Sequence, residues 1–417
     1  MGKTIIEKIL SANSKQVAKP GDIVIAQIDS AMVHDINGPA TIDCLAELNT
    51  EMKLPSKNVA FFLDHYAPCP TINAANAHNK LRDFAKKQGI KVFQPGEGIC
   101  HQLFLENGYA LPGKVCAGTD SHTCTYGALN SLGISIGATE MAVILACGQC
   151  WLKVPETILV TLTGEMPWYL TAKDIALHLI KIVTEAGAIY QCIEFNGDTL
   201  KQLSIDSRIV ICNMLVEMGA KAGIMPGDEK LRDWYAARDI KIDSFVDADL
   251  DAEYCRKITI DVSKITPQVA KSPAIDNVFD VKEAAGTKVD QVIIGSCTNG
   301  RYEDFKVAAD ILKGKQISED VRLILVPASR QVYKEMIQNG LLTTFIESGA
   351  SINPPGCGPC AGLHGGLVGD GEVVLTTTNR NMKGRMGSNK ADIHVCSPIT
   401  AAYAALAGEI VDYTAKE

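Results

Sequence analysis

Three cysteines form the grouping with the clearest chemistry in this sequence. Cys357 and Cys360 are separated by two residues and follow Pro354-Pro355-Gly356, and Cys297 lies within Gly295-Ser296-Cys297-Thr298-Asn299. Two thiolates at this spacing can face one metal centre from a single turn. Three thiolates leave one iron of an iron-sulfur cluster without a protein ligand, and an open iron can act as a Lewis acid on a hydroxyl and a carboxylate. The count of three favours catalysis, whereas four would favour electron transfer.

Two other interpretations of the cysteines stay open at this point. Cys357-Gly358-Pro359-Cys360 also matches a thioredoxin-type redox pair, although no strand ending in an aromatic residue precedes it. Cys147 and Cys150 could complete a four-cysteine zinc site, but the apolar segment 141–151 predicts a buried helix in which they pack. We expect the other cysteines to be structural or incidental: Cys44, Cys69, Cys100, Cys116, Cys124, Cys192, Cys212, Cys255 and Cys396.

Candidate acids and bases follow predicted strand ends. Asp64-His65 comes after the apolar run 58–63, and Asp120-Ser121-His122 comes after the bend at Gly118-Thr119. A histidine beside a carboxylate can deliver a proton near neutral pH. Residues 120–122 are not expected to form a hydrolase triad, because adjacent residues do not normally converge as nucleophile, base and orienting group. His101 and Glu194 are lone candidates, for which a structural histidine and a surface carboxylate are the alternatives.

Two arginines, Arg380 and Arg385, stand on either side of Gly384 in the segment 376–385. The guanidinium fork binds carboxylates through two hydrogen bonds, which lysine cannot do. A solvated basic loop is the alternative interpretation of this segment. Beside an open-site cluster, the two arginines indicate capture of a di- or tricarboxylate.

Alternating strand and helix patterns must position these groups. Apolar runs predict strands at 22–27, 59–63, 157–163, 291–295, 321–326 and 373–376, and helical patterns fall at 72–87, 172–185 and 301–313. This alternation is typical of α/β layers with mostly parallel sheets, whose ligands bind at the carboxyl ends of strands. We expect three α/β/α domains around a central site: 1–153 with the acid/base residues, 154–268, and 269–417 with the cluster ligands and arginines.

Bulk composition excludes several classes of protein. The 417 residues are 47% hydrophobic and carry a net charge of −8, which argues against a dedicated nucleic-acid binder. Lys3, Glu7 and Lys8 interrupt any apolar core of a secretory signal, and no apolar stretch of about 18 residues predicts a membrane span. We therefore expect a cytoplasmic protein, with neither nucleic acid nor membrane as a partner, whose cysteines are reduced or hold metal.

Taken together, the motifs resemble the aconitase superfamily, in its branch of 3-isopropylmalate dehydratase large subunits. The matching segments occur in the family's order and span nearly the whole chain: Asp64-His65, 96–101, 118–123, 295–299, 356–360 and 379–385. The resemblance implies an aconitase-like fold and one 4Fe-4S cluster. Single motifs of this kind are common, but their joint occurrence is specific.

The resemblance also assigns roles to residues. It implies that Cys297, Cys357 and Cys360 hold the cluster, and that Asp64 and His65 protonate the departing hydroxyl, with Asp120 and His122 nearby. His101 and Glu194 are similar to residues that support substrate, water and the open iron. Arg380 and Arg385 correspond to carboxylate-binding arginines, Ser121 lies beside the site, and His34 falls where the family has a polar residue on the substrate side.

Two departures from single-chain aconitases favour a split enzyme. Those proteins have a further mobile domain with a serine base, whereas this sequence ends at Glu417, and Cys124-Thr125 replaces a Pro and an Asn near their cluster. The resemblance implies a small-subunit partner carrying the swivelling domain, in a heterodimer or heterotetramer.

The implied reaction is a hydro-lyase step on a hydroxy-acid. The favoured one is interconversion of 2- and 3-isopropylmalate in leucine biosynthesis, with homoaconitase and citramalate or 2,3-dimethylmalate hydro-lyases as alternatives. The rivals outside this class are a thiol oxidoreductase that uses Cys357 and Cys360, and an iron-sensing, RNA-binding apo-protein.

Overall fold

Buried apolar runs form the strands of this α/β protein. The computed structural model describes residues 2–414. All six predicted strands and all three predicted helices are present, with ends within two residues of the predicted bounds. β3 (Val59–Phe62) and β14 (Gln291–Gly295) are buried along their whole length. Such burial is expected of parallel strands covered by helices on both faces.

The first sheet is parallel throughout and has the order β4-β3-β2-β5-β6. Its other strands are β2 (Ser30–His34), β4 (Lys91–Phe93), β5 (Val115–Gly118) and β6 (Leu132–Ser135). The helices of this part are α1 (Ile5–Ser14), α2 (Gly38–Glu47), α3 (Ile72–Gln88), α4 (Cys100–Glu106) and α5 (Ala138–Cys147). A 3-10 segment, η2 (Ser121–Leu129), follows β5 and carries part of the candidate site.

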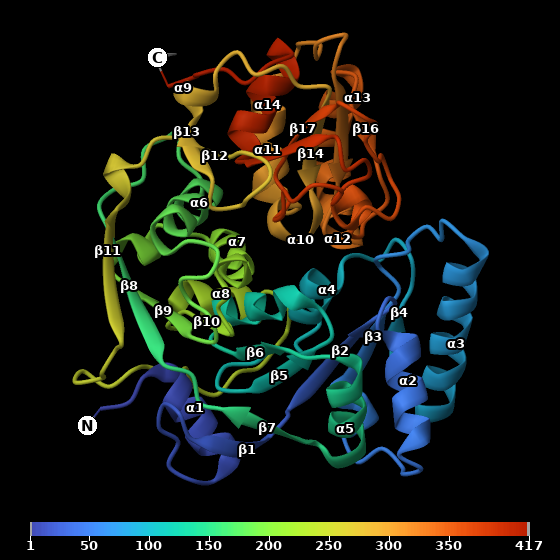
Figure 1. Cartoon of the computed structure of the whole chain (residues 1–417), viewed down its shortest axis with the longest axis vertical. Coiled ribbons are helices and arrows are strands. Elements are labelled where there is room, and N and C mark those ends of the chain that lie inside the picture. Colours follow the sequence, from blue (N-terminus) through green and yellow to red (C-terminus); the bar gives the residue numbers. More distant parts are fainter. Residues whose placement is uncertain (1, 415–417) are drawn as a thin grey trace.

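The second sheet is also parallel, with the order β10-β9-β8-β11. Its strands are β8 (Thr157–Thr163), β9 (Cys192–Asn196), β10 (Ala222–Ile224) and β11 (Arg256–Asp261). The helices that follow them are α6 (Ala172–Val183), α7 (Ile205–Met214) and α8 (Glu229–Ala236). A two-stranded antiparallel ribbon of β1 (Ile23–Gln27) and β7 (Gln149–Lys153) lies beside the first sheet (Figure 1).

The third sheet has the order β13-β12-β18-β17-β14-β15-β16 and is parallel except at β12 and β13. Its strands are β12 (Gln268–Ala270), β13 (Val278–Asp280), β15 (Arg322–Val326), β16 (Ser351–Ile352), β17 (Val373–Thr376) and β18 (Asp392–Cys396). The helices are α9 (Val281–Ala284), α10 (Ser296–Asn299), α11 (Tyr302–Leu312), α12 (Arg330–Gln338), α13 (Leu341–Glu347) and α14 (Pro398–Ala407). The predicted domain boundary at 153 follows the last residue of β7, whereas the one at 268 falls at the first residue of β12; the division into domains remains a prediction.

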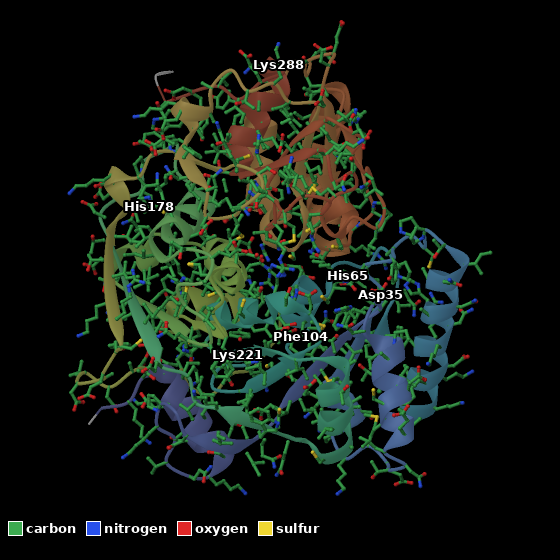
Figure 2. All side chains as sticks on the ribbon, in the orientation of Figure 1. Asp35, His65, Phe104, His178, Lys221 and Lys288 are labelled. Atoms are coloured by element: carbon green, nitrogen blue, oxygen red, sulfur yellow. The ribbon has the colours of Figure 1, made fainter. Side chains whose placement is uncertain are left out.

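The carboxyl ends of strands from two sheets face each other. Figure 1 shows α10 and α12 of the third part turned toward the first sheet. Figure 2 places His65, just beyond the end of β3, in the region where these two parts meet. An open α/β sheet binds ligands at such strand ends. The fold therefore brings loops from both parts to one central place.

The prediction for Cys147 and Cys150 is wrong. Helix α5 ends at Cys147, and Gly148 has a left-handed φ of 74° that turns the chain into strand β7. Glycine tolerates this conformation and commonly ends helices. Cys147 is exposed, and Cys150 is half-buried on strand β7 at the edge of a core cluster, so neither lies in a buried helix interior. Elsewhere, no helix among residues 2–414 is long and apolar enough to cross a membrane.

Candidate active site

A tight turn at the end of β14 positions Cys297. Gly295 has φ 140°, and a Cβ atom there would lie 2.1 Å from the carbonyl oxygen of Val326 on the neighbouring strand. Ser296 has φ 66°, a left-handed conformation that is unusual for a serine and occurs in strained turns at functional sites. The turn starts helix α10, on which Cys297 is buried. Close strand packing therefore fixes where the thiol points.

The other two cysteines reach the same place. Cys357 and Cys360 are buried, and the amide nitrogen of Cys357 donates to the carbonyl oxygen of Asp64 at 3.0 Å. Asn379 joins the two segments: its Nδ2 donates to Cys297 Sγ at 3.3 Å, and its Oδ1 accepts from Cys360 Sγ at 3.5 Å. The structure thus brings together all three predicted ligands next to Asp64.

The three thiols fit an iron-sulfur cluster. They offer three buried sulfur ligands, the atom type that holds iron-sulfur clusters. The Cys357 thiol donates to Cys360 and lowers the pKa of Cys360 well below its usual range, although burial acts in the opposite direction. Burial raises the pKa of Cys297 to about 11. A metal cluster would deprotonate all three.

His65 is held by two carboxylates on opposite edges of its ring. Its Nδ1 lies 3.0 Å from Asp64 Oδ1, and its Nε2 lies 3.5 Å from Asp120 Oδ2. Burial alone would lower the pKa of His65, but these carboxylates raise it well above its usual value. The amide of Cys100 holds Asp64 Oδ2 at 2.7 Å. The two carboxylates therefore favour the protonated ring of His65 and fix its orientation.

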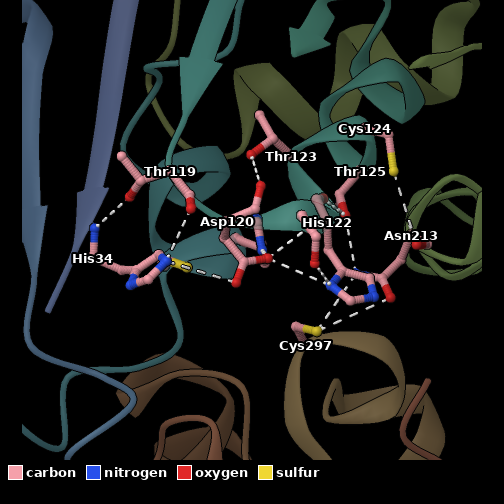
Figure 3. A network of polar contacts seen from close by, with 12 residues as sticks. His34, Thr119, Asp120, His122, Thr123, Cys124, Thr125, Asn213 and Cys297 are labelled. Carbon is pink, nitrogen blue, oxygen red and sulfur yellow. Dashed lines mark hydrogen bonds and ion pairs between the residues drawn. The ribbon is translucent and has the colours of Figure 1, made fainter. Parts of the chain in front are cut away.

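Asp120 connects several histidines. Its Oδ1 lies 2.7 Å from His101 Nε2 and accepts from the amide of His122 at 2.7 Å. Its Oδ2 lies 3.9 Å from His34 Nε2. Burial would raise the pKa of Asp120, but His101 and its other partners lower it well below the usual range. Figure 3 shows Asp120 between His34 and His122, with Cys297 close to His122.

A carboxylate that the sequence analysis did not single out, Glu217, completes this network. Its Oε1 lies 2.9 Å from His122 Nε2 and 2.8 Å from Arg380 Nε. Arg380 Nη2 also donates to Ser121 Oγ at 3.0 Å, and Ser121 Oγ lies 3.1 Å from His122 Nδ1. Burial would raise the pKa of Glu217, but His122 and Arg380 lower it. Arg380 is thereby aimed into the same site as the histidines.

Arg385 points at the cysteines. Burial would lower the pKa of Arg385, but the charges of Cys360 and Cys357 raise it. Its Nε is buried and has no hydrogen-bond partner within residues 2–414, and the same holds for His101 Nδ1. Unpaired buried polar atoms are rare and usually mark a place where a ligand or water binds. The Arg385 donor is suited to an anionic ligand near the thiols, whereas His101 faces the Asp120 carboxylate through Nε2, which leaves Nδ1 for water or a ligand hydroxyl.

Glu194 lies apart from these residues. It belongs to strand β9, where its Oε2 accepts from the amide of Ile5 at 2.9 Å and its Oε1 from Tyr254 Oη at 2.5 Å. Both oxygens are thus occupied by the N-terminal helix and a loop. The structure brings the other predicted site residues together, and the glutamate that lies among them is Glu217 rather than Glu194.

Asn213 is a second site residue that the sequence analysis missed. Its Nδ2 lies 2.9 Å from Thr125 Oγ1 and 3.5 Å from Cys297 Sγ. A signal was present, because Asn213 and Glu217 interrupt the apolar stretch 209–218 and are four residues apart. Residues at this spacing lie on one face of a helix.

The aconitase family, described as aconitate hydratase, matches residues 7–408, and the chain belongs to this family. The large subunit 1 of 3-isopropylmalate dehydratase from Methanopyrus kandleri is 46% identical over 413 residues, 99% of each chain. A probable methanogen homoaconitase large subunit from Methanothermobacter thermautotrophicus is 41% identical over 410 residues, 97% of this chain and 96% of the relative.

A solved structure supports the fold independently. The holo-form of aconitase X from Thermococcus kodakaraensis has a TM-score of 0.50 at 14% sequence identity, covering 93% of this chain and 89% of that one. At this identity the similarity concerns the fold alone. The resemblance and the fold class expected from the motifs are confirmed.

Proposed function

We propose that this chain is the large catalytic subunit of a hydro-lyase that interconverts 2- and 3-isopropylmalate in leucine biosynthesis. The observation that carries the proposal is the convergence of three buried thiols with a doubly held His65 and two arginines in one site. Relatives that match over nearly their whole length are named as large subunits of this enzyme.

Cys297, Cys357 and Cys360 would hold one 4Fe-4S cluster. Such a cluster, held by three thiolates, supplies a Lewis-acidic iron for the hydroxyl and a carboxylate of the substrate. Asn379 Nδ2, which lies 3.3 Å from Cys297 Sγ, would donate a hydrogen bond to that thiolate. Arg385 Nε would donate to bound substrate, and His101 Nδ1 would be free to accept from substrate or water.

His65 would donate a proton from Nε2 to the departing hydroxyl. Asp64 would keep Nδ1 of His65 protonated and hold the ring in place. Asp120 lies beside Nε2, the nitrogen that would give up its proton. A general acid must be protonated at the working pH, and the raised pKa of His65 meets this requirement. Arg380, aimed by Glu217 and Ser121, would bind one carboxylate of the substrate, and Arg385 another.

A small subunit would complete the site. The relatives' names as large subunits imply a partner for those proteins, and we extend this to the present chain. Asp120 and Arg380 are 16% and 20% exposed, so the network has an open edge against which a partner could dock. The partner would supply the base that takes the carbon-bound proton.

Homoaconitase is the second candidate, because a relative of that name is 41% identical over almost the same length. The thiol oxidoreductase is less well supported, since Cys357 and Cys360 are only 4% and 3% exposed and a redox pair must be reachable. Assaying the chain with its co-purified small subunit on isopropylmalate, homocitrate, citramalate and dimethylmalate decides between these. Turnover highest on isopropylmalate supports the proposal, and turnover on none of the four acids contradicts it.

A further inference from the structure

Lys173 is a buried cation without an anionic partner. It lies at the start of helix α6 and is fully buried. Its ammonium donates to the carbonyl oxygen of Thr378 at 2.9 Å and to Met214 Sδ at 3.6 Å, which are both neutral. Among residues 2–414, no carboxylate lies within ion-pair distance of Lys173 Nζ. Its charge is therefore not balanced by an ion pair.

Two physical effects make this placement unfavourable. Burying an unpaired charge costs several kcal/mol or shifts the pKa of the group. The amino end of a helix carries partial positive charge, which repels a cation in the first turn. Burial lowers the pKa of Lys173 to about 8. A buried lysine at this point needs a negative charge nearby to be stabilised.

The negative charges that act most strongly on the pKa of Lys173, against the larger effect of burial, would be those of Cys396, Cys297, Asp304 and Cys360. Asp304 is already engaged by Asn299 Nδ2 at 2.8 Å and by the amide of Arg301 at 3.0 Å. The Cys396 thiol donates to the carbonyl oxygen of Ser397 at 3.4 Å, so Asp304 and Cys396 both already have hydrogen-bond partners. Cys297 and Cys360, two of the three proposed cluster ligands, are the remaining partners.

We propose that Lys173 is the counter-charge of the iron-sulfur cluster and a positioning residue for its ligands. This inference rests on the proposed function, because it requires the cluster to be present. Three thiolates outweigh the positive charge of an oxidised cluster core, so the bound cluster would be an anion. Lys173 acts through charge and also through its bond to Thr378, the residue before Asn379. Asn379 in turn contacts Cys297 and Cys360.

The charge should affect the cluster in two measurable ways. Reduction adds an electron, so a buried cation nearby raises the reduction potential. The same unpaired cation destabilises the apo-protein, and the negative charge of the bound cluster would offset this destabilisation. Loading the cluster should therefore raise the Tm of the wild-type chain more than that of a chain without the charge.

The test compares Lys173→Met and Lys173→Gln with the wild type, each as apo-protein and after anaerobic cluster assembly. Methionine removes both charge and donor, whereas glutamine removes the charge but keeps an N–H donor. Lys221→Met is the control, because Lys221 is half-buried and also donates to a carbonyl oxygen, that of Ser135 at 2.9 Å, but the charges acting on its pKa are those of Cys150 and Glu140, not of the proposed cluster ligands. The readouts are the midpoint potential of the cluster and the Tm difference between loaded and apo forms.

Both Lys173 variants should have a more negative potential and a smaller Tm gain on loading, while Lys221→Met matches the wild type. An unchanged midpoint potential in either folded, cluster-loaded variant would overturn the counter-charge proposal. If the potential changes in Lys173→Met but not in Lys173→Gln, only the hydrogen bond matters, and the proposal is overturned as well. If one variant does not fold, the other decides. A wild-type chain that assembles no cluster refutes the proposed function itself, an outcome that cluster absorbance identifies before any variant is compared.

Discussion

Glu217 Oε1 accepts a hydrogen bond from Arg380 Nε at 2.8 Å. The same oxygen lies 2.9 Å from His122 Nε2, so one buried carboxylate orients an imidazole and a guanidinium together. Glu194, the carboxylate that the motifs favoured, is also buried but lies in strand β9 and contacts Ile5 and Tyr254. These two glutamates provide a direct comparison between a site carboxylate and a structural one.

Glu217→Gln should lower kcat/KM at least about tenfold, equivalent to roughly 1.4 kcal/mol of transition-state stabilisation. The amide oxygen can still accept from both groups but lacks the negative charge that strengthens these bonds, which leaves Arg380 less firmly oriented. The measurement is steady-state kinetics of the complex with matched cluster content. Glu194→Gln is the control and should change the Tm rather than kcat/KM. Equal losses of activity in both variants would contradict the assignment of Glu217 to the site.

The charge of Asp64 should set the pH range of activity. Burial would lower the pKa of His65, but the nearby Asp64 carboxylate helps to raise it well above its usual value. His65 should therefore stay protonated at neutral pH and lose its proton only at higher pH. Activity should therefore fall on the alkaline side. Asp64→Asn removes the negative charge, lowers the pKa of His65 and should shift the alkaline limb of kcat/KM to lower pH. A limb that stays in place would show that another group titrates there.

The sequence predicted the strands and most of the site because both depend on local patterns. Asp64-His65, Asp120 and Cys297 each follow a buried strand, and the carboxyl ends of parallel strands meet at one edge. Glu217 was missed because its role depends on the placement of α7 and the turn after it against η2, which no local pattern specifies.

The same limit explains the error at Cys147. Apolar composition alone predicts burial, but one left-handed glycine, Gly148, ended the helix and sent the chain to pair with β1. Tertiary packing decides which face of the β1–β7 ribbon is covered. Periodicity over so short a segment cannot distinguish a helix end from a strand start.

Arg385→Lys keeps the charge but removes the planar fork. Its Nε is buried without a partner in the described part of the chain and lies beside the cluster ligands. We expect kcat/KM to fall at least about tenfold while iron content stays normal, because lysine cannot form the bidentate pair with a carboxylate. Kinetics and iron analysis of the same preparation test this. Full activity of Arg385→Lys would remove the arginine from the carboxylate site.

The chain alone should bind the cluster but turn over no substrate. The expectation follows from the proposed small subunit, which would supply the base for the carbon-bound proton. Mixing the separately purified, cluster-loaded chain with the small subunit should generate the absorbance of the unsaturated intermediate. Turnover by the isolated chain, shown by mass spectrometry to be free of any partner, would mean that the base lies within residues 1–417.

The central claim is that Cys297, Cys357 and Cys360 hold a cluster with one iron that lacks a protein ligand. Iron and sulfide analysis of anaerobic protein, with EPR spectra before and after brief oxidation, tests it most directly. We predict about four irons per chain, loss of about one on oxidation with a three-iron signal, and restoration by ferrous iron. Cys297→Ser should lose most of its iron. A cluster that keeps all its iron on oxidation, or unchanged iron and sulfide in Cys297→Ser, would contradict the account.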